Sequence, residues 1–209
     1  MTMPLHTDVL PRIQRQLFER LARQPWLQPF YLAGGTALAL HIGHRRSIDF
    51  DFFSPREFSA RSIREQLAAL GSYELFTEER HTMHGALNGV KVSFFAYPYP
   101  LLHVCSVHHV LSIASLRDIA LMKLSAISGR GSRKDFVDLA FLLDHFTLRN
   151  LLRSYPRKFG KAVANPYHLL KSLVYFADAE QEPMPCMIQP LAWSAVKSRI
   201  MNAVRDTRL

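Results

Sequence analysis

The chain has 209 residues, enough for one large domain or two small domains with a buried core. With 48% hydrophobic and 21% charged residues, its composition is that of an ordinary globular protein. Lysine and arginine number 26 against 17 acidic residues, and the formal charge of +9 favours a polyanionic partner, with nucleic acid as the first hypothesis, over an acidic or neutral one.

The chain begins with a predicted helix and a predicted strand. Between residues 9 and 23, apolar residues recur at helical spacing, at Leu10, Ile13, Leu17 and Leu21. Pro25 and Pro29 end this helix, and residues 30–33 then predict a short apolar strand. A second helix is expected over residues 36–42.

Gly34, Gly35 and Thr36 lie at the junction between this strand and the second helix. Backbone N–H groups at the start of a helix can bind an anion, and glycines let a phosphate approach the backbone closely. The junction therefore predicts a phosphate-binding turn.

Residues 48–52 alternate apolar and acidic side chains. The alternation predicts a strand with Asp49 and Asp51 on one face and with Ile48, Phe50 and Phe52 on the other. Carboxylates two residues apart on a strand are separated by roughly 6.5 to 7 Å and can bind one or two hard cations such as Mg²⁺. The plain alternative is that the aspartates are solvated on an edge strand and that the glycines only form a turn.

The order Gly34-Gly35-Thr36, a helix, and then Arg45-Arg46-Ser47-Ile48-Asp49-Phe50-Asp51 resembles the first motif of the nucleotidyltransferase superfamily. Residues 33–40 and 44–53 together resemble the AbiEii-type toxins of type IV toxin–antitoxin and phage-defence systems. The resemblance implies that Asp49 and Asp51 bind Mg²⁺. It also implies that an NTP is held by some or all of Gly34, Gly35, Thr36, Arg45, Arg46 and Ser47.

A helix that ends near Gly71 and then three strands are expected after this motif. Residues 73–80, 83–87 and 90–97 predict strands that extend the same sheet, and Asn88-Gly89 predicts a two-residue hairpin turn. Residues 104–110 predict a short strand or connector. The nearby His103, His108 and His109 have no acid or cysteine at ligand spacing in the sequence, which argues against a metal site there.

Beyond Ser115 the sequence predicts helices over residues 116–128, 133–145, 148–159, 166–177 and 191–204. Lys123 interrupts the apolar face of the first of them. An ammonium group there either extends to the surface or is held for a function, because burying an unpaired charge is costly.

The segment from Lys123 to Leu139 also resembles the AbiEii pattern of a lysine, a loop with arginine and glycine, and Arg/Lys-Asp-x-x-Asp-Leu. The resemblance implies that Lys123 contacts nucleotide phosphates and that Asp135 completes the acidic site or positions a basic group in it. In the alternative, Asp135 is a first-turn acid after an N-cap at Ser132, and Asp138 pairs with Lys134.

One residue departs from the pattern of many nucleotidyltransferases, which carry a third carboxylate on a later strand. The matching position holds Ser93, and no acidic residue occurs between His81 and Arg117. Either the general base comes from the Asp135 region, or the acceptor is activated without a carboxylate, or activity is weakened or lost.

The segment between His145 and Ala177 has no acidic residue. It contains the cations Arg149, Arg153, Arg157, Lys158, Lys161 and Lys171 together with the aromatic residues Tyr155, Phe159 and Tyr167. Cations can follow a phosphate backbone and aromatic rings can stack on bases, so the segment favours an RNA-facing surface over an ordinary solvated helical face.

The expected fold is therefore α+β: a nucleotidyltransferase-type mixed β-sheet flanked by helices in residues 1–110, followed by a helical region in residues 111–209 that packs over the active site. The two cysteines, Cys105 and Cys186, predict neither a disulfide nor a zinc site. Without a signal peptide or an apolar run of roughly 18 residues, a soluble, cytoplasmic protein is expected.

The implied reaction is Mg²⁺-dependent transfer of a nucleoside monophosphate from an NTP to a hydroxyl, with Asp49, Asp51, Lys123 and Asp135 as catalytic residues. The acceptor is RNA, with a tRNA 3′ end favoured, or a protein side chain, and a cognate antitoxin is a possible partner. One alternative is a catalytically silent protein that binds nucleotide or RNA. Another is a small-molecule nucleotidyltransferase, which the basic charge opposes because its acceptors are cationic.

Overall fold

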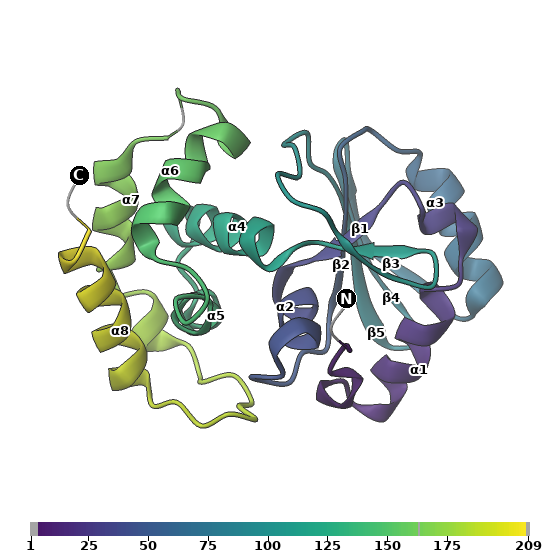
Figure 1. Ribbon diagram of the computed structural model, residues 1–209. Coiled ribbons are helices and arrows are strands. Elements are labelled where there is room, and N and C mark those ends of the chain that lie inside the picture. The colour runs from purple at the N-terminus through teal and green to yellow at the C-terminus, as the bar shows by residue number, and fades with distance from the viewer. Residues whose placement is uncertain (1–3, 163, 208–209) are drawn as a thin grey trace.

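The computed structural model describes residues 4–162 and 164–207, in which a mixed β-sheet carries helices on both faces and a helical region lies to one side (Figure 1). Within these residues, seven strands form one sheet in the order β3-β4-β5-β2-β1-β7-β6. The strands are β1 Tyr31–Ala33, β2 Phe50–Ser54, β3 Tyr73–Glu79, β4 Thr82–Leu87, β5 Val90–Ala96, β6 Ser106–His108 and β7 Leu111–Ile113. This α+β arrangement was predicted and is confirmed.

The helices follow the predicted order. They are α1 Arg12–Leu21, α2 Gly34–Ile42, α3 Ala60–Leu70, α4 Leu116–Gly129, α5 Arg133–Leu142, α6 Leu148–Phe159, α7 Pro166–Leu173 and α8 Trp193–Arg205, with short 3₁₀ helices at Thr7–Val9, Pro25–Leu27 and Ala179–Gln181. Helices α5 and α7 end earlier than predicted, at Leu142 and Leu173. Within residues 4–162 and 164–207, no helix combines the length and apolar character needed to cross a bilayer.

Strand β2 lies in the middle of the sheet. It pairs antiparallel with β1 and parallel with β5, so both of its edges are hydrogen-bonded. The alternative in which Asp49 and Asp51 are solvated on an edge strand is therefore wrong. The apolar face of β2 also needs apolar side chains from both neighbouring strands beside it. The hydrophobic core is therefore centred on this strand.

The two faces of β2 differ as the alternation predicted, with one exception. Phe50 and Phe52 are fully buried and stack with each other on the side of the sheet that α1 and α3 cover (Figure 1). Asp51 lies on the opposite face, on the side of α2. Ile48 was predicted on the apolar face but is 55% exposed, because the strand begins only at Phe50.

The β4–β5 and β6–β7 hairpins were predicted unequally well. Asn88 and Gly89 form the turn between β4 and β5 with φ of 52° and 78°, as the Asn-Gly pair predicted. Strand β7 was missed, since its three residues are too few to show a period and it is held by parallel pairing with β1. The predicted boundary between the sheet domain and the helical region, between residues 110 and 111, stays a prediction. Strand β7 follows this boundary in the chain but belongs to the sheet.

The helical region is attached to the sheet through α4. Helix α4 contacts α2 and packs against α5, α6 and α7, while α8 packs against α5 and α7. Helix α5 also contacts α2. Helix α2 therefore lies between the sheet and helices α4 and α5.

Candidate active site

The glycine turn, formed by Gly34 and Gly35, lies at the junction between β1 and α2. Gly34 has φ +72°, in the left-handed region that favours glycine, and a Cβ there would lie 2.9 Å from Oδ2 of Asp51. A Cβ at Gly35 would collide with the guanidinium group of Arg45. Both glycines are thus needed for the close approach of a charged side chain, beyond forming a turn.

Asp51 lies at the start of β2, the end that faces this turn, whereas Asp49, predicted on the same strand, directly precedes it. In register, Asp51 lies between Ala33 of β1 and Ser93 of β5, and both aspartates are half-buried. Burial and the neighbouring carboxylate of Asp49 raise the pKa of Asp51, although lysines 91, 123 and 134 act in the opposite direction. A carboxylate whose charge is disfavoured by a neighbouring carboxylate is well suited to a divalent cation, which relieves the repulsion.

Thr36 and Ser47 fix the approach to β2. Their hydroxyl oxygens lie 2.7 Å apart and both side chains are buried. The Thr36 hydroxyl also hydrogen-bonds the backbone carbonyl of Asp49. These two side chains therefore tie the first turn of α2 to the segment that presents Asp49.

Arg45 is held by Asp138 of α5. Its Nε donates to Oδ1 at 2.7 Å and its Nη2 donates to Oδ2 at 3.0 Å, and the arginine is only 5% exposed. Nε2 of the buried His44 lies 2.8 Å from Oδ1 of the same carboxylate. Burial lowers the pKa of His44 despite this contact, so the imidazole is neutral and donates from Nε2. Arg46, in contrast, is exposed.

Lys123 completes the partners of Asp138. Its Nζ lies 2.7 Å from Oδ1 of Asp135 and 2.7 Å from Oδ2 of Asp138, and the side chain is buried. Burial by itself would lower the pKa of Lys123, but the two carboxylates raise it, so the ammonium stays charged. The alternative in which Lys123 extends to the surface is wrong. So is the pairing of Asp138 with Lys134, which is exposed.

Asp135 is fully engaged as well. Beyond Lys123, its Oδ2 accepts from Ser132 Oγ at 2.6 Å and from Arg130 Nε at 3.1 Å. Ser132 is the N-cap residue of α5, as predicted, but its hydroxyl binds this carboxylate and makes no backbone cap bond. Although burial opposes it, Lys123 and Arg130 hold the pKa of Asp135 below its usual range. A carboxylate in this state is a poor general base.

A serine and a histidine occupy the position of the missing third carboxylate. Ser93 is buried beside Asp51, and its Oγ lies 2.9 Å from Nδ1 of His84 on β4. Asp51, Ser93 and His84 are register partners across three strands, so their side chains share one face of the sheet. Sequence reasoning missed His84, although the two-residue turn that places Leu87 opposite Val90 also places His84 opposite Ser93.

The basic segment of residues 145–177 is only partly a surface. Tyr155 and Phe159 are buried in the core, and Lys158 is buried in an ion pair with Asp118 at 2.9 Å, so these three were wrongly predicted to face RNA. Tyr167 is 73% exposed. The exposed cations are Arg149, Arg153, Arg157, Lys161 and Lys171.

Two solved structures resemble the whole arrangement. JHP933 from Helicobacter pylori has a TM-score of 0.55 and 19% identity, and the match covers 94% of this chain and 92% of that one. MenT4, a nucleotidyltransferase toxin from Mycobacterium tuberculosis H37Rv, has a TM-score of 0.50 and 15% identity over 87% of this chain and 77% of its own. The fold is thus that of a nucleotidyltransferase, as predicted.

Sequence comparison identifies the family. The model described as "Nucleotidyl transferase AbiEii toxin, Type IV TA system" matches residues 15–103, which include the glycine turn, the aspartate pair and Ser93. An uncharacterized protein of Aquifex aeolicus (strain VF5) is 40% identical over 206 residues, covering 94% of this chain and 97% of that protein. The chain belongs to the AbiEii nucleotidyltransferase toxin family and is a nucleotidyltransferase. Such enzymes generally use divalent metals, and membership of a type IV toxin–antitoxin family implies an NTP substrate and an antitoxin partner.

Proposed function

We propose that the enzyme uses Mg²⁺ at Asp49 and Asp51 to transfer a nucleoside monophosphate from an NTP to a hydroxyl group of RNA, with a tRNA 3′ end as the favoured acceptor. The proposal rests above all on the aspartate pair: Asp51 lies on the central strand β2 against the left-handed Gly34, and Asp49 directly precedes that strand. Its donor atoms are all oxygen, which suits Mg²⁺. When bound, the cation stabilises the charge that develops on the phosphates during transfer.

The start of α2 binds the triphosphate in this proposal. The backbone N–H groups of Gly35 and Thr36 lie in the first turn of a nine-residue helix, where the helix dipole favours an anion. The exposed Arg46 adds positive charge to the same loop. Arg45 and Ser47, whose side chains are committed to Asp138 and Thr36, act as positioning residues.

Lys123 and Asp135 supply and orient positive charge beside the aspartate pair. The ammonium of Lys123 lies close enough to Asp51 to lower the pKa of that carboxyl, so it also lies within reach of phosphates held there. Asp135 anchors Arg130, whose side chain is 67% exposed and whose charge is also felt by Asp51. We therefore assign Asp135 the task of positioning these two cations.

His84 is our candidate for accepting the proton of the acceptor hydroxyl. With Nδ1–H donating to Ser93 Oγ, the lone pair of Nε2 is available on the face that carries Asp51. Imidazole is the side chain most often used as a general base. The Ser93 hydroxyl then orients the ring, as a carboxylate partner does in other sites.

RNA is favoured as the acceptor by charge. The formal charge is +9, and exposed arginines follow one another along α6 at Arg149, Arg153 and Arg157. A protein side chain or a small molecule is the competing acceptor. The antitoxin that the family implies is expected to oppose this activity in the cytoplasm of the host cell.

The direct test is incubation of purified protein with total RNA, Mg²⁺ and each α-labelled NTP in turn. Wild type should transfer label to a discrete RNA band of tRNA size with one NTP. Asp51→Asn should lose this transfer by more than the roughly 100-fold that even an outer partner of a metal ligand costs. Asp178→Asn changes the charge of an exposed aspartate by the same amount and should behave as wild type.

Two results would overturn the proposal. Label on protein or on a small molecule in place of RNA would keep the enzyme class and reject the acceptor. Equal labelling by wild type and Asp51→Asn would reject the aspartate pair as the site. Circular dichroism of each variant separates loss of activity from loss of folding.

A further inference from the structure

We propose that Glu19, His108 and His109 form a second metal site, with Zn²⁺ as its cation. A carboxylate oxygen and two imidazole nitrogens of these residues lie within 4.8 Å of one another. Nε2 of His108 is 3.1 Å from Oε1 of Glu19, and Nε2 of His109 is 3.4 Å from Oε2. The sequence argued against metal binding by these histidines for lack of a nearby acid, and the fold supplies one from a segment 89 residues earlier.

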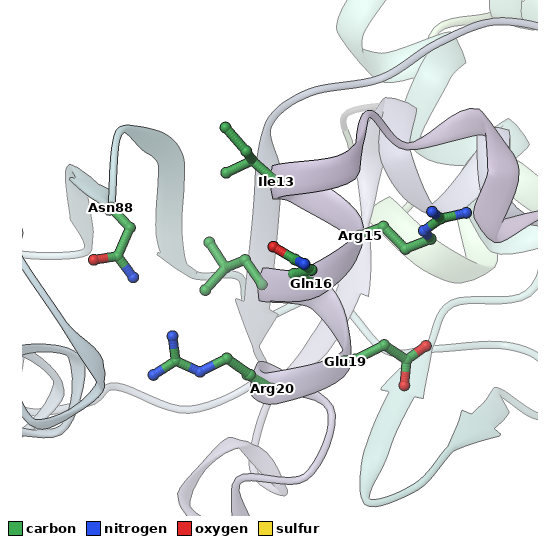
Figure 2. Close-up of a pocket in the computed structure, with 7 residues that line it drawn as sticks. Ile13, Arg15, Gln16, Glu19, Arg20 and Asn88 are labelled. Carbon is green, nitrogen blue, oxygen red and sulfur yellow. The ribbon is translucent and has the colours of Figure 1, made fainter.

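Three structural elements direct these side chains to one point. Figure 2 shows Glu19 projecting from α1 on the side away from Ile13, Arg20 and Asn88, with which it lines a surface pocket. His108 ends β6, and its ring stacks on Phe18 at 5.1 Å with an interplanar angle of 14°.

His109 occupies the tight turn into β7 with φ +53°, a left-handed conformation that few residues with a side chain adopt. This backbone directs the His109 ring beside His108, with the ring centroids 4.6 Å apart. Two consecutive histidines in an extended strand would point to opposite faces of the sheet. The left-handed turn is therefore what brings both imidazoles to the same carboxylate.

The donor set fits Zn²⁺ better than Mg²⁺. Neutral imidazole nitrogens suit Zn²⁺ and similar transition metals, whereas Mg²⁺ takes oxygen ligands. Two histidines and a glutamate give three of the four ligands of a tetrahedral zinc ion, and the half-exposed setting leaves water for the fourth. Small movements of the side chains would bring all three donors to bonding distance.

The site is separate from the aspartate pair. Phe18 contacts both His108 and Phe50, so the three residues lie on the α1 side of the sheet, whereas Asp51 lies on the other face of β2. A cation there would join α1 to the β6–β7 hairpin at the edge of the sheet. Its expected effect is on stability and does not depend on nucleotidyl transfer.

The test is a titration of tag-free, metal-free protein with Zn²⁺ by calorimetry and with Co²⁺ by visible absorption, alongside thermal unfolding. The Asp49→Asn/Asp51→Asn double variant is the background, so that cation binding at the aspartate pair does not contribute. In this background, one equivalent of Zn²⁺ should bind and raise the melting temperature, and Co²⁺ should show the d–d absorption of a tetrahedral ion.

His109→Asn and Glu19→Gln should each remove this binding. Asparagine tolerates the left-handed backbone and glutamine keeps a hydrogen-bond acceptor for His108, so the metal-free fold should persist. His103→Asn removes an exposed histidine outside the cluster and should bind as the background does. Absence of saturable binding in the background, or binding unchanged in His109→Asn and Glu19→Gln, would leave only histidine–glutamate ion pairs and overturn the site.

Discussion

At the scale of single residues, the candidate active site contains features that lower the stability of the fold. Asp51 is kept in a partly buried place beside another carboxylate, and both effects raise its pKa. Gly34 adopts a left-handed backbone directly against that carboxylate. Features of this kind stabilise a bound ligand more than they stabilise the fold, which is typical of functional sites.

Asp51→Asn should therefore raise the melting temperature of metal-free protein at neutral pH. The folded-state pKa of Asp51 is raised, so its ionisation costs stability as pH rises from the unfolded pKa through the folded one. Asparagine has no such cost. The gain should shrink as the pH falls towards the ordinary aspartate value, where both proteins carry a neutral side chain. Thermal unfolding across pH measures this, and a variant less stable than wild type at neutral pH would contradict it.

Gly34→Ala should lose nucleotidyl transfer as well as stability. A left-handed backbone costs a residue with a side chain roughly 1–2 kcal/mol, and the new Cβ would also displace the Asp51 carboxylate. Gly89→Ala is the matched control, because Gly89 has φ +78° and no atom within 4 Å of the added Cβ. It should show a similar loss of stability in denaturant titration with transfer intact. Equal transfer activity in the two variants would show that Gly34 is not part of the active site.

At the scale of elements, Asp138 joins three parts of the chain. Its carboxylate contacts His44 and Arg45 from the loop after α2, and Lys123 from α4. Despite its burial, Lys123 and Arg45 hold the pKa of Asp138 well below the usual value. The buried charges are compensated only while all of these partners are present.

Asp138→Ala should destabilise the protein by about 3–5 kcal/mol, since it leaves buried cations without their carboxylate. Lys134→Ala, one turn earlier on the exposed side of α5, should change stability by no more than about 0.5 kcal/mol. Denaturant titration measures both. A small loss for Asp138→Ala would mean that water or other groups compensate the cations.

Many of the helices and strands could be predicted from the sequence, because long elements show the periodicity of their apolar residues. Helix α6 was predicted at its observed bounds, and the β4–β5 hairpin followed from Asn88-Gly89. The partners of Asp138 could not be predicted, since Arg45 lies 93 residues away and no local pattern links them. Tyr155 was assigned to a surface because it was grouped with the cations of the segment, although it recurs at helical spacing after the buried Leu148 and Leu151.

At the scale of the whole molecule, the positive charge is spread over both sides of the sheet. Arginines 149, 153 and 157 follow one another every four residues on α6, so they form one exposed stripe on the helical region. Exposed arginines also occur near α1, at positions 12, 15 and 23, on the other side of the sheet. Net charge alone does not say which set meets RNA.

The triple variant Arg149→Ala/Arg153→Ala/Arg157→Ala should weaken RNA binding and lower the slope of log affinity against log salt by about 2, as expected for three lost contacts to single-stranded phosphates. The triple variant Arg12→Ala/Arg15→Ala/Arg23→Ala removes equal charge and should have a smaller effect. Filter binding at several salt concentrations compares them. Equal slopes would assign the effect to net charge.

The long sequence separation between Asp138 and its partners His44 and Arg45 also affects the synthesis of the protein. In the candidate active site, the glycine turn, the aspartate pair and Ser93 all lie within the first 93 residues, whereas Lys123, Asp135 and Asp138 come later. A chain still emerging from the ribosome therefore has His44 and Arg45 without their carboxylate until α5 has left the exit tunnel. The growing chain therefore lacks part of its candidate active site until its helical region is made.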